Sequence, residues 1–147
     1  MFETTQTSQH IASGHMTHLL RPKELRTRID LAVRALQTHT FDTIAFRGMS
    51  GAFLGPQIAA FLDKEMILVR KPHDDTHSFY NVEGFKGARR YIIVDDFISL
   101  GGTKRAIIEA VSKFAPDANF VGLLPVLRIR DYMLEHSERH NTPYPLE

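Results

Sequence analysis

The chain has 147 residues, of which 43% are hydrophobic and 24% are charged, and its formal net charge is +1. This length fits one domain with a sizeable core, and the balanced charge excludes a disordered chain or a strongly basic one that coats nucleic acid. The chain has no cysteine, which excludes disulfides, thiolate metal sites and cysteine nucleophiles. No stretch approaches the ~18 apolar residues of a membrane span, so we expect no membrane partner.

The first part of the chain predicts a polar arm followed by a helix. Residues 1–20 have neither a basic segment nor a long apolar one, so we expect no secretory signal and a cytoplasmic protein. From Pro22 onward, apolar residues recur at helical spacing, and proline suits a first helical turn. The apolar positions of this amphipathic helix are Leu25, Ile29, Ala32, Val33 and Leu36.

Residues 43–69 predict a strand, a loop, a helix and a second strand. Apolar runs at 43–46 (TIAF) and 66–69 (MILV) are the strands, and 56–62 is the helix between them. The intervening Arg47-Gly48-Met49-Ser50-Gly51 has small residues that let backbone amides approach an anion. Small residues also make ordinary tight turns, so both interpretations stay open.

Two cations, Arg70 and Lys71, follow the second strand. They would suit a polyphosphate opposite a glycine-rich loop, but paired basic residues are also typical of a solvated strand end. The polar stretch 72–90 has no sustained periodicity and is longer than a loop in a compact domain without a functional reason. We therefore predict a mobile lid over residues 72–90.

The rest of the chain predicts two further strands around a helix. Residues 91–94 (YIIV) and 119–127 are the strands, and 103–114 is the helix. Short, continuously apolar strands alternating with helices indicate a doubly wound α/β domain, with a mainly parallel sheet and helices on both faces. Residues 128–147 form a tail.

Two adjacent aspartates, Asp95 and Asp96, follow the strand at 91–94. Residues 99–103 then form a loop and the start of a helix, where unpaired amides and the helix dipole favour a phosphate. A carboxylate repels phosphate, so the aspartates should engage sugar hydroxyls or a bound Mg²⁺ on the same ligand. The pattern therefore predicts a site for a sugar with a terminal phosphate. Alternatively, one aspartate caps the helix or joins an ion pair, and the other is solvated.

The stretch "YIIVDDFISLGGT" resembles the 5-phosphoribosyl-1-pyrophosphate (PRPP) signature of type I phosphoribosyltransferases. The resemblance extends over residues 40–127, where "FRGMSG" is similar to the pyrophosphate loop, "LVRK" to the next strand and its cationic end, and 72–90 to the flexible catalytic loop. It implies a core over 21–127, with a small hood built from residues 1–20 and 128–147. From the resemblance we also expect the chain to form a homodimer or a higher homo-oligomer.

The resemblance also implies roles for particular residues. Asp95 and Asp96 would bind the ribose hydroxyls and, mainly through the pyrophosphate and water, Mg²⁺, and these two residues with Lys71 would be catalytic. The residues implied to bind PRPP are Arg47, Gly48, Ser50, Arg70, Lys71, His77, Asp95, Asp96, Ser99, Leu100, Gly101, Gly102 and Thr103.

The resemblance implies a nucleobase phosphoribosyltransferase, with PRPP and a base as its partners and no nucleic acid. Ser78 and Tyr80 resemble the adenine enzymes, while His77 and the Val82-Glu83-Gly84 spacing resemble the orotate enzymes. We favour a purine over orotate. Leu100 stands where the family commonly has a threonine that contacts the 5-phosphate, which leaves a third reading: a non-catalytic PRPP-binding regulatory protein on the same fold.

Overall fold

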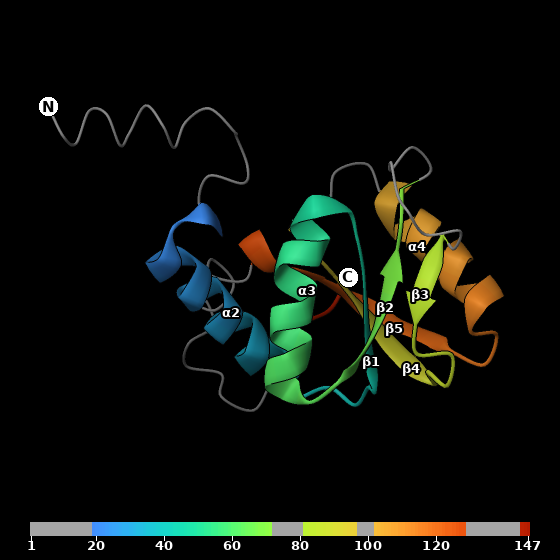
Figure 1. The fold of residues 1–147 in the computed structure, drawn as a ribbon. Coiled ribbons are helices and arrows are strands. Elements are labelled where there is room, and N and C mark those ends of the chain that lie inside the picture. The colour runs from blue at the N-terminus through green and yellow to red at the C-terminus, as the bar shows by residue number, and fades with distance from the viewer. Residues whose placement is uncertain (1–18, 72–80, 97–101, 129–144) are drawn as a thin grey trace, which may run out of the picture.

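The computed structural model of the chain describes residues 19–71, 81–96, 102–128 and 145–147. A five-stranded sheet has the strand order β3-β2-β1-β4-β5, with helices on both faces (Figure 1). Strands β1, β2, β4 and β5 are parallel, and β3 pairs antiparallel with β2. The predicted doubly wound, mainly parallel α/β class is therefore confirmed. The strands are β1 (Thr43–Arg47), β2 (Glu65–Val69), β3 (Val82–Gly84), β4 (Arg90–Asp95) and β5 (Asn119–Pro125).

Two apolar cores lie on the two faces of the sheet. Helices α2 (Pro22–Leu36) and α3 (Gly48–Leu62) cover one face, and α4 (Gly102–Phe114) covers the other (Figure 1). Successive strand residues alternate between the faces, so Ile44 and Phe46 pack with α2 and α3, while Ala45 packs with α4. This double cover explains why the parallel strands are apolar at consecutive positions.

Helix α3 begins earlier than the sequence pattern indicates. The expected loop at 47–51 does not form, because the chain enters the helix at Gly48, directly after β1. Gly48 has φ +74°, a conformation that glycine adopts without steric cost. Pro56 therefore lies inside the helix and not in its first turn. Because proline has no backbone N–H, one hydrogen bond within the helix is missing at this position.

The predicted lid over 72–90 is wrong in its second half. Val82–Gly84 forms the edge strand β3, in which Glu83 pairs with Leu68 and Val82 with Val69. Ala88 is fully buried. A three-residue strand has too little periodicity to be recognised, and its pairing depends on β2. Residues 72–80 lie outside the described residues, so the remainder of the lid stays a prediction.

The last predicted strand is also shorter than expected. Strand β5 ends at Pro125, and the 3₁₀ helix η2 (Val126–Arg128) follows at once. The other elements lie within one residue of their predicted bounds. The hood expected from residues 1–20 and 128–147 falls mostly on residues 1–18 and 129–144, which lie outside the described ranges. Among the residues that the structure describes, no helix is long and apolar enough to cross a membrane.

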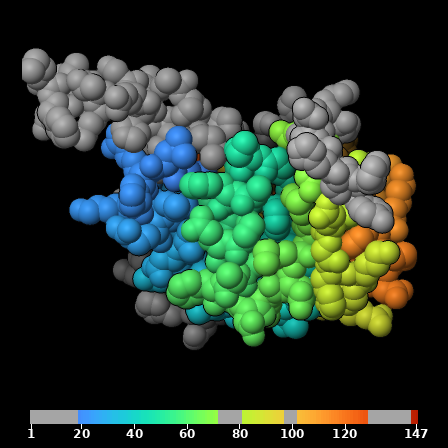
Figure 2. Space-filling model, in the orientation of Figure 1, coloured from blue at the N-terminus to red at the C-terminus, as the bar shows by residue number. Residues whose placement is uncertain are grey.

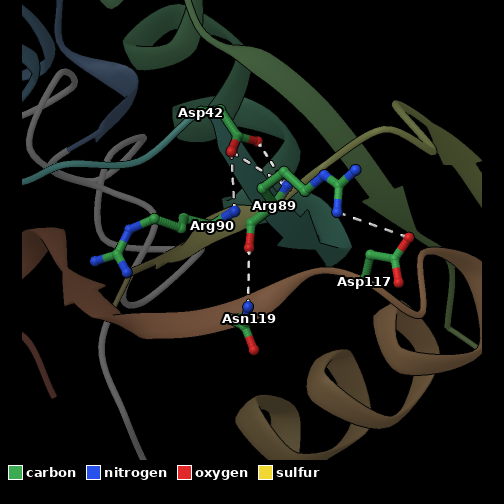
Figure 3. A network of polar contacts seen from close by, with 5 residues as sticks. All are labelled: Asp42, Arg89, Arg90, Asp117 and Asn119. Carbon is green, nitrogen blue, oxygen red and sulfur yellow. Dashed lines mark hydrogen bonds and ion pairs between the residues drawn. The ribbon is translucent and has the colours of Figure 1, made fainter.

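Asp42 ties the starts of four strands together at the edge of the sheet opposite to the strand ends discussed below. Its carboxylate accepts hydrogen bonds from the backbone N–H groups of Arg89 and Arg90 (Figure 3). Its backbone carbonyl accepts from Glu65 N, and the Arg89 carbonyl accepts from Asn119 N. The side chain of Asp42 thus links the entries to β1 and β4, and backbone hydrogen bonds of Asp42 and Arg89 extend the link to β2 and β5.

Candidate functional site

The predicted site residues come from the carboxyl ends of three adjacent parallel strands. In the ladder between β1 and β2, Arg47 lies opposite Val69, so Arg70 and Lys71 emerge beside the end of β1. Strand β4 flanks β1 on its other side and ends at Asp95. Ligands of open α/β sheets bind outside this edge. The cationic ends of β1 and β2 therefore lie next to the acidic end of β4.

Asp95 and Asp96 are buried, with 8% and 7% of their surfaces exposed. Oδ1 of Asp95 accepts a hydrogen bond from Asp96 N at 2.9 Å. Burial raises the pKa of Asp95 from 3.8 to about 6; the hydrogen bond from Asp96 N opposes the rise, and the nearby Asp96 carboxylate adds to it. Two buried acids at a strand end are costly for folding, and such costs concentrate at functional sites.

Ser50 brings the first turn of α3 to the end of β4. Its Oγ donates to Asp95 Oδ1 at 3.4 Å, which opposes part of the rise in the pKa of Asp95. This contact exists because α3 begins at Gly48, which places Ser50 over the neighbouring strand end. The structure thus joins two predicted site residues that are far apart in the sequence.

Gly48 and Lys71 lie in close contact. A Cβ atom at Gly48 would lie 2.8 Å from Cε and 3.2 Å from Nζ of Lys71. The ammonium group therefore lies near the start of α3, in the space that a Cβ at residue 48 would occupy. The combination of an exposed cation and a helix N-terminus favours an anion at this place.

Two arginines stand at the same edge: Arg47 ends β1, and Arg70 follows β2. Arg70 Nη2 forms an ion pair with Glu83 Oε1 at 2.9 Å, which ties the end of β2 to β3. Within the part of the chain that the structure describes, Nε of Arg47 and Nε of Arg70 are buried without a hydrogen-bond acceptor. Buried donors normally have a partner. An anionic ligand at this edge would supply one.

The sequence analysis did not predict the ion pair between Arg70 and Glu83. The pair requires the antiparallel register of β2 and β3, which places Glu83 opposite Leu68. A charge alternation along a three-residue strand is too short a signal to reveal such a partner. The pair was therefore visible only once the sheet was assembled.

The predicted phosphate loop is described only at its end. Gly102 and Thr103 form the first turn of α4, and a Cβ at Gly102 would meet no atom within 4 Å. The predicted residues Ser99, Leu100, Gly101 and His77 lie outside the described ranges.

The donors at the site suit Mg²⁺ in one way only. Across the described ranges, no three His, Cys, Asp or Glu residues gather closely enough to form a metal site of their own. Asp95 and Asp96 nevertheless supply hard oxygen donors, and Mg²⁺ commonly binds through one or two carboxylates while it keeps waters and phosphate oxygens. The residues therefore fit Mg²⁺ delivered with a phosphorylated ligand.

Comparison with known proteins shows what this arrangement resembles. No family model matches the chain. It is 30% identical to the adenine phosphoribosyltransferase of Bifidobacterium longum strain DJO10A over 131 residues, which cover 78% of this chain and 67% of that protein. Identity to the adenine phosphoribosyltransferase of Rhodopirellula baltica is 28% over 119 residues, or 71% of this chain and 57% of that protein. The chain thus spans between about half and two thirds of the length of these two relatives.

Solved structures agree with the sequence relatives. The adenine phosphoribosyltransferase of Saccharomyces cerevisiae, solved as a complex with an imino-altritol bisphosphate and adenine, superposes with a TM-score of 0.57 at 25% identity, over 79% of this chain and 78% of that one. The orotate phosphoribosyltransferase of Aeropyrum pernix shares the fold, with a TM-score of 0.56 at 17% identity over 73% of this chain and 60% of that one. The chain belongs to the type I phosphoribosyltransferase family.

Proposed function

We propose that the protein is a purine nucleobase phosphoribosyltransferase of nucleotide salvage, which transfers the 5-phosphoribosyl group of PRPP to a base and releases pyrophosphate. The observation that carries the proposal is the buried pair Asp95 and Asp96, placed between the start of α4 and the cationic ends of β1 and β2. PRPP has matching parts: a ribose with hydroxyls, a 5-phosphate and a pyrophosphate. The sequence relatives named adenine phosphoribosyltransferase support a purine as the acceptor.

Each part of the site has a role in this reaction. Asp95 and Asp96 accept hydrogen bonds from the two ribose hydroxyls, and the amides at the start of α4, with Thr103, hold the 5-phosphate. Arg47, Lys71 and the start of α3 hold the pyrophosphate. Departure of pyrophosphate leaves positive charge on the sugar C1, so a stabilised leaving group and a positioned base account for most of the catalysis.

Lys71 has the most specific task among the cations. Its Nζ lies near Gly48 at the start of α3, so it can face a pyrophosphate oxygen that the helix amides also bind. Mg²⁺, held by the pyrophosphate with Asp95 and Asp96 through water, would neutralise charge on the leaving group. Residues 72–80, with His77, complete the proposal as the segment that excludes water.

The deciding experiment measures pyrophosphate release from PRPP and Mg²⁺ in the presence of adenine, hypoxanthine, guanine or orotate, one base at a time. We expect turnover with a purine. Turnover with orotate alone would assign the protein to the orotate enzymes, and PRPP binding without turnover on any base would assign it to the regulatory reading. The double variant Asp95→Asn/Asp96→Asn should lose PRPP binding, whereas Asp117→Asn, on the exposed turn before β5, should keep it.

Leu100 offers a separate test of the ligand. If this position faces the 5-phosphate, Leu100→Thr adds a hydroxyl donor to a charged oxygen, which is worth roughly 1.5 to 3 kcal/mol. PRPP affinity should then rise about tenfold or more. Isothermal titration of both proteins with PRPP and Mg²⁺ measures this, and Leu100→Val serves as the control without a hydroxyl.

We also propose that the protein is a cytoplasmic homodimer that uses α3 as its interface. Helix α3 has no charged residue, yet Met49 and Phe61 are 78% and 75% exposed, and α3 lies at the surface in Figure 2. A helix that is apolar all round is normally covered. A second copy suits this face, because the uncharged helices meet without repulsion and the hollow beside Phe61 has one cation and one anion, Arg26 and Asp30, at its rim.

A further inference from the structure

A chain of contacts connects helix α2 with the backbone of Asp96. Arg28 Nη1 donates to the carbonyl of Leu127 at 3.1 Å, and Leu127 N donates to the carbonyl of Asp96 at 2.9 Å. Both backbone groups of Leu127 in η2 are thus engaged, the carbonyl by α2 and the N–H by Asp96, the residue that follows β4. The guanidinium of Arg28 therefore lies two hydrogen bonds away from Asp96.

The ladder between β4 and β5 cannot hold Asp96 by itself. Asp95 lies opposite Pro125, the last residue of β5, so Asp96 lies one residue beyond the last pair of this ladder. The chain then turns into η2, and Leu127 N takes over as the donor to the Asp96 carbonyl. The position of Asp96 depends for this reason on η2, a single 3₁₀ turn with little intrinsic stability.

Arg28 is well suited to hold η2. Its side chain is only 12% exposed, and its Nε donates to Glu24 Oε1 at 3.2 Å, one helical turn earlier. Glu24 fixes the guanidinium so that Nη1 points at the Leu127 carbonyl, and a charged donor makes a stronger hydrogen bond than a neutral one. Val126 is fully buried in the core shared with α2 and α3, so η2 is anchored on both sides.

We propose that Arg28 is a positioning residue for PRPP: through Leu127 it fixes η2, and η2 fixes the backbone of Asp96 where that residue binds the ribose. This inference rests on the proposed function. It assigns to helix α2, outside the PRPP signature, a share in the affinity for the sugar. The competing reading is that Arg28 only fastens α2 to the domain.

The chain offers a matched control in Arg34. Arg34 lies on the same helix and has the same kind of ion pair, with Asp30 at 2.9 Å, but its side chain is 62% exposed. Arg28→Gln and Arg34→Gln therefore remove the same charge and one i,i+4 pair each. The structure records the contact with η2 for Arg28 alone of these two residues.

The test titrates wild type, Arg28→Gln and Arg34→Gln with PRPP and Mg²⁺ below the unfolding temperature of each protein. Arg28→Gln should weaken PRPP binding about three- to tenfold, the scale of one ordinary hydrogen bond, because Arg28 acts on Asp96 through Leu127. Arg34→Gln should leave PRPP binding unchanged. Hydrogen exchange of the Leu127 amide should be faster in Arg28→Gln only. If the protein catalyses the transfer, KM for PRPP should rise in Arg28→Gln, while KM for the base should stay constant.

The outcomes separate the two ideas. If the wild type does not bind PRPP, the proposed function is wrong and this inference falls with it. If the wild type binds PRPP and Arg28→Gln binds it equally well, the proposed function stands and the inference is overturned. Should Arg28→Gln fail to fold, Glu24→Ala decides: a smaller loss of affinity with faster exchange at Leu127 supports the proposal, and unchanged affinity overturns it.

Discussion

Ser50 Oγ donates a hydrogen bond to Asp95 Oδ1 across 3.4 Å and thereby joins the first turn of α3 to the end of β4. This hydrogen bond lowers the pKa of Asp95 only slightly, because burial is the largest effect on the carboxyl group and raises its pKa to about 6. The site therefore stores an unfavourable negative charge at neutral pH. A site that destabilises the ligand-free protein in this way is typical of a binding site whose polar groups find their partners in the ligand.

Asp95→Asn should stabilise the protein at pH 8 and have little effect at pH 4. The folded pKa of about 6 exceeds the ordinary 3.8, so the folded state binds the proton more tightly. The stability that this group contributes is full below pH 3.8 and is lost as the pH rises through 6. The neutral amide avoids this loss, which amounts to at most about 3 kcal/mol for a shift of about two units.

Urea unfolding of both proteins at pH 4 and pH 8 measures this effect, with Asp117→Asn as an exposed control. A stabilisation of equal size at the two pH values would show that packing, rather than ionisation, distinguishes the amide. The same variant should bind PRPP less well, so the gain in stability and the loss of affinity should come from one substitution.

Gly48→Ala should destabilise the fold by about 1–2 kcal/mol, the cost of a left-handed conformation for a residue with a Cβ. Gly48 has φ +74°, and the new methyl group would displace Lys71. The loss in the free energy of PRPP binding should exceed the loss in the free energy of unfolding. Gly102→Ala is the matched control for stability, because its Cβ meets nothing within 4 Å. Thermal unfolding of both variants decides, and equal midpoints would contradict the prediction.

Asp42→Asn should destabilise the protein by roughly 1–3 kcal/mol, because it weakens the hydrogen bonds that Arg89 N and Arg90 N donate to a charged acceptor. Burial acts to raise the pKa of Asp42, but the hydrogen bonds from Thr43, Arg90 and Arg89 outweigh it and lower the pKa. This stability is present above pH 3.8 and is lost as the pH falls through the lowered folded value.

The control for Asp42 lies in the same network (Figure 3). Asp117 pairs with Arg89 at 3.9 Å with 78% of its side chain exposed, so Asp117→Asn should change stability by less than about 0.5 kcal/mol. Denaturant unfolding between pH 3 and pH 7 compares the two. If both variants unfold at the same denaturant concentration as the wild type, Asp42 does not hold the strand entries together.

Phe61→Glu should convert the proposed dimer into a monomer. The substitution buries one carboxylate per protomer in the apolar part of the contact, which opposes association. Light scattering coupled to size-exclusion chromatography reports the mass of each variant. Phe85→Glu, at a residue 37% exposed after β3, should remain dimeric. A wild type that is monomeric at every concentration would remove the proposal.

The local pattern was sufficient to predict most elements and to locate the acidic and cationic strand ends. Continuous apolar runs predicted β1, β2 and β4, because strands covered on both faces have no polar side, and helical spacing predicted α2 and α4. Asp95 and Asp96 were identified from their place between an apolar run and a glycine pair. The start of α3 was missed, because Gly48 turns the chain in one residue where the pattern indicated a loop.

The sequence by itself determined the class of the sheet, its acidic strand end and the cationic ends of two other strands. Tertiary structure alone decided which groups meet: Ser50 with Asp95, Lys71 with Gly48, Arg70 with Glu83 and Arg28 with Leu127. The physical reason is that periodicity reflects burial, which each residue experiences locally. Partners of hydrogen bonds and ion pairs depend on strand order and register, which exist only when distant segments have packed together.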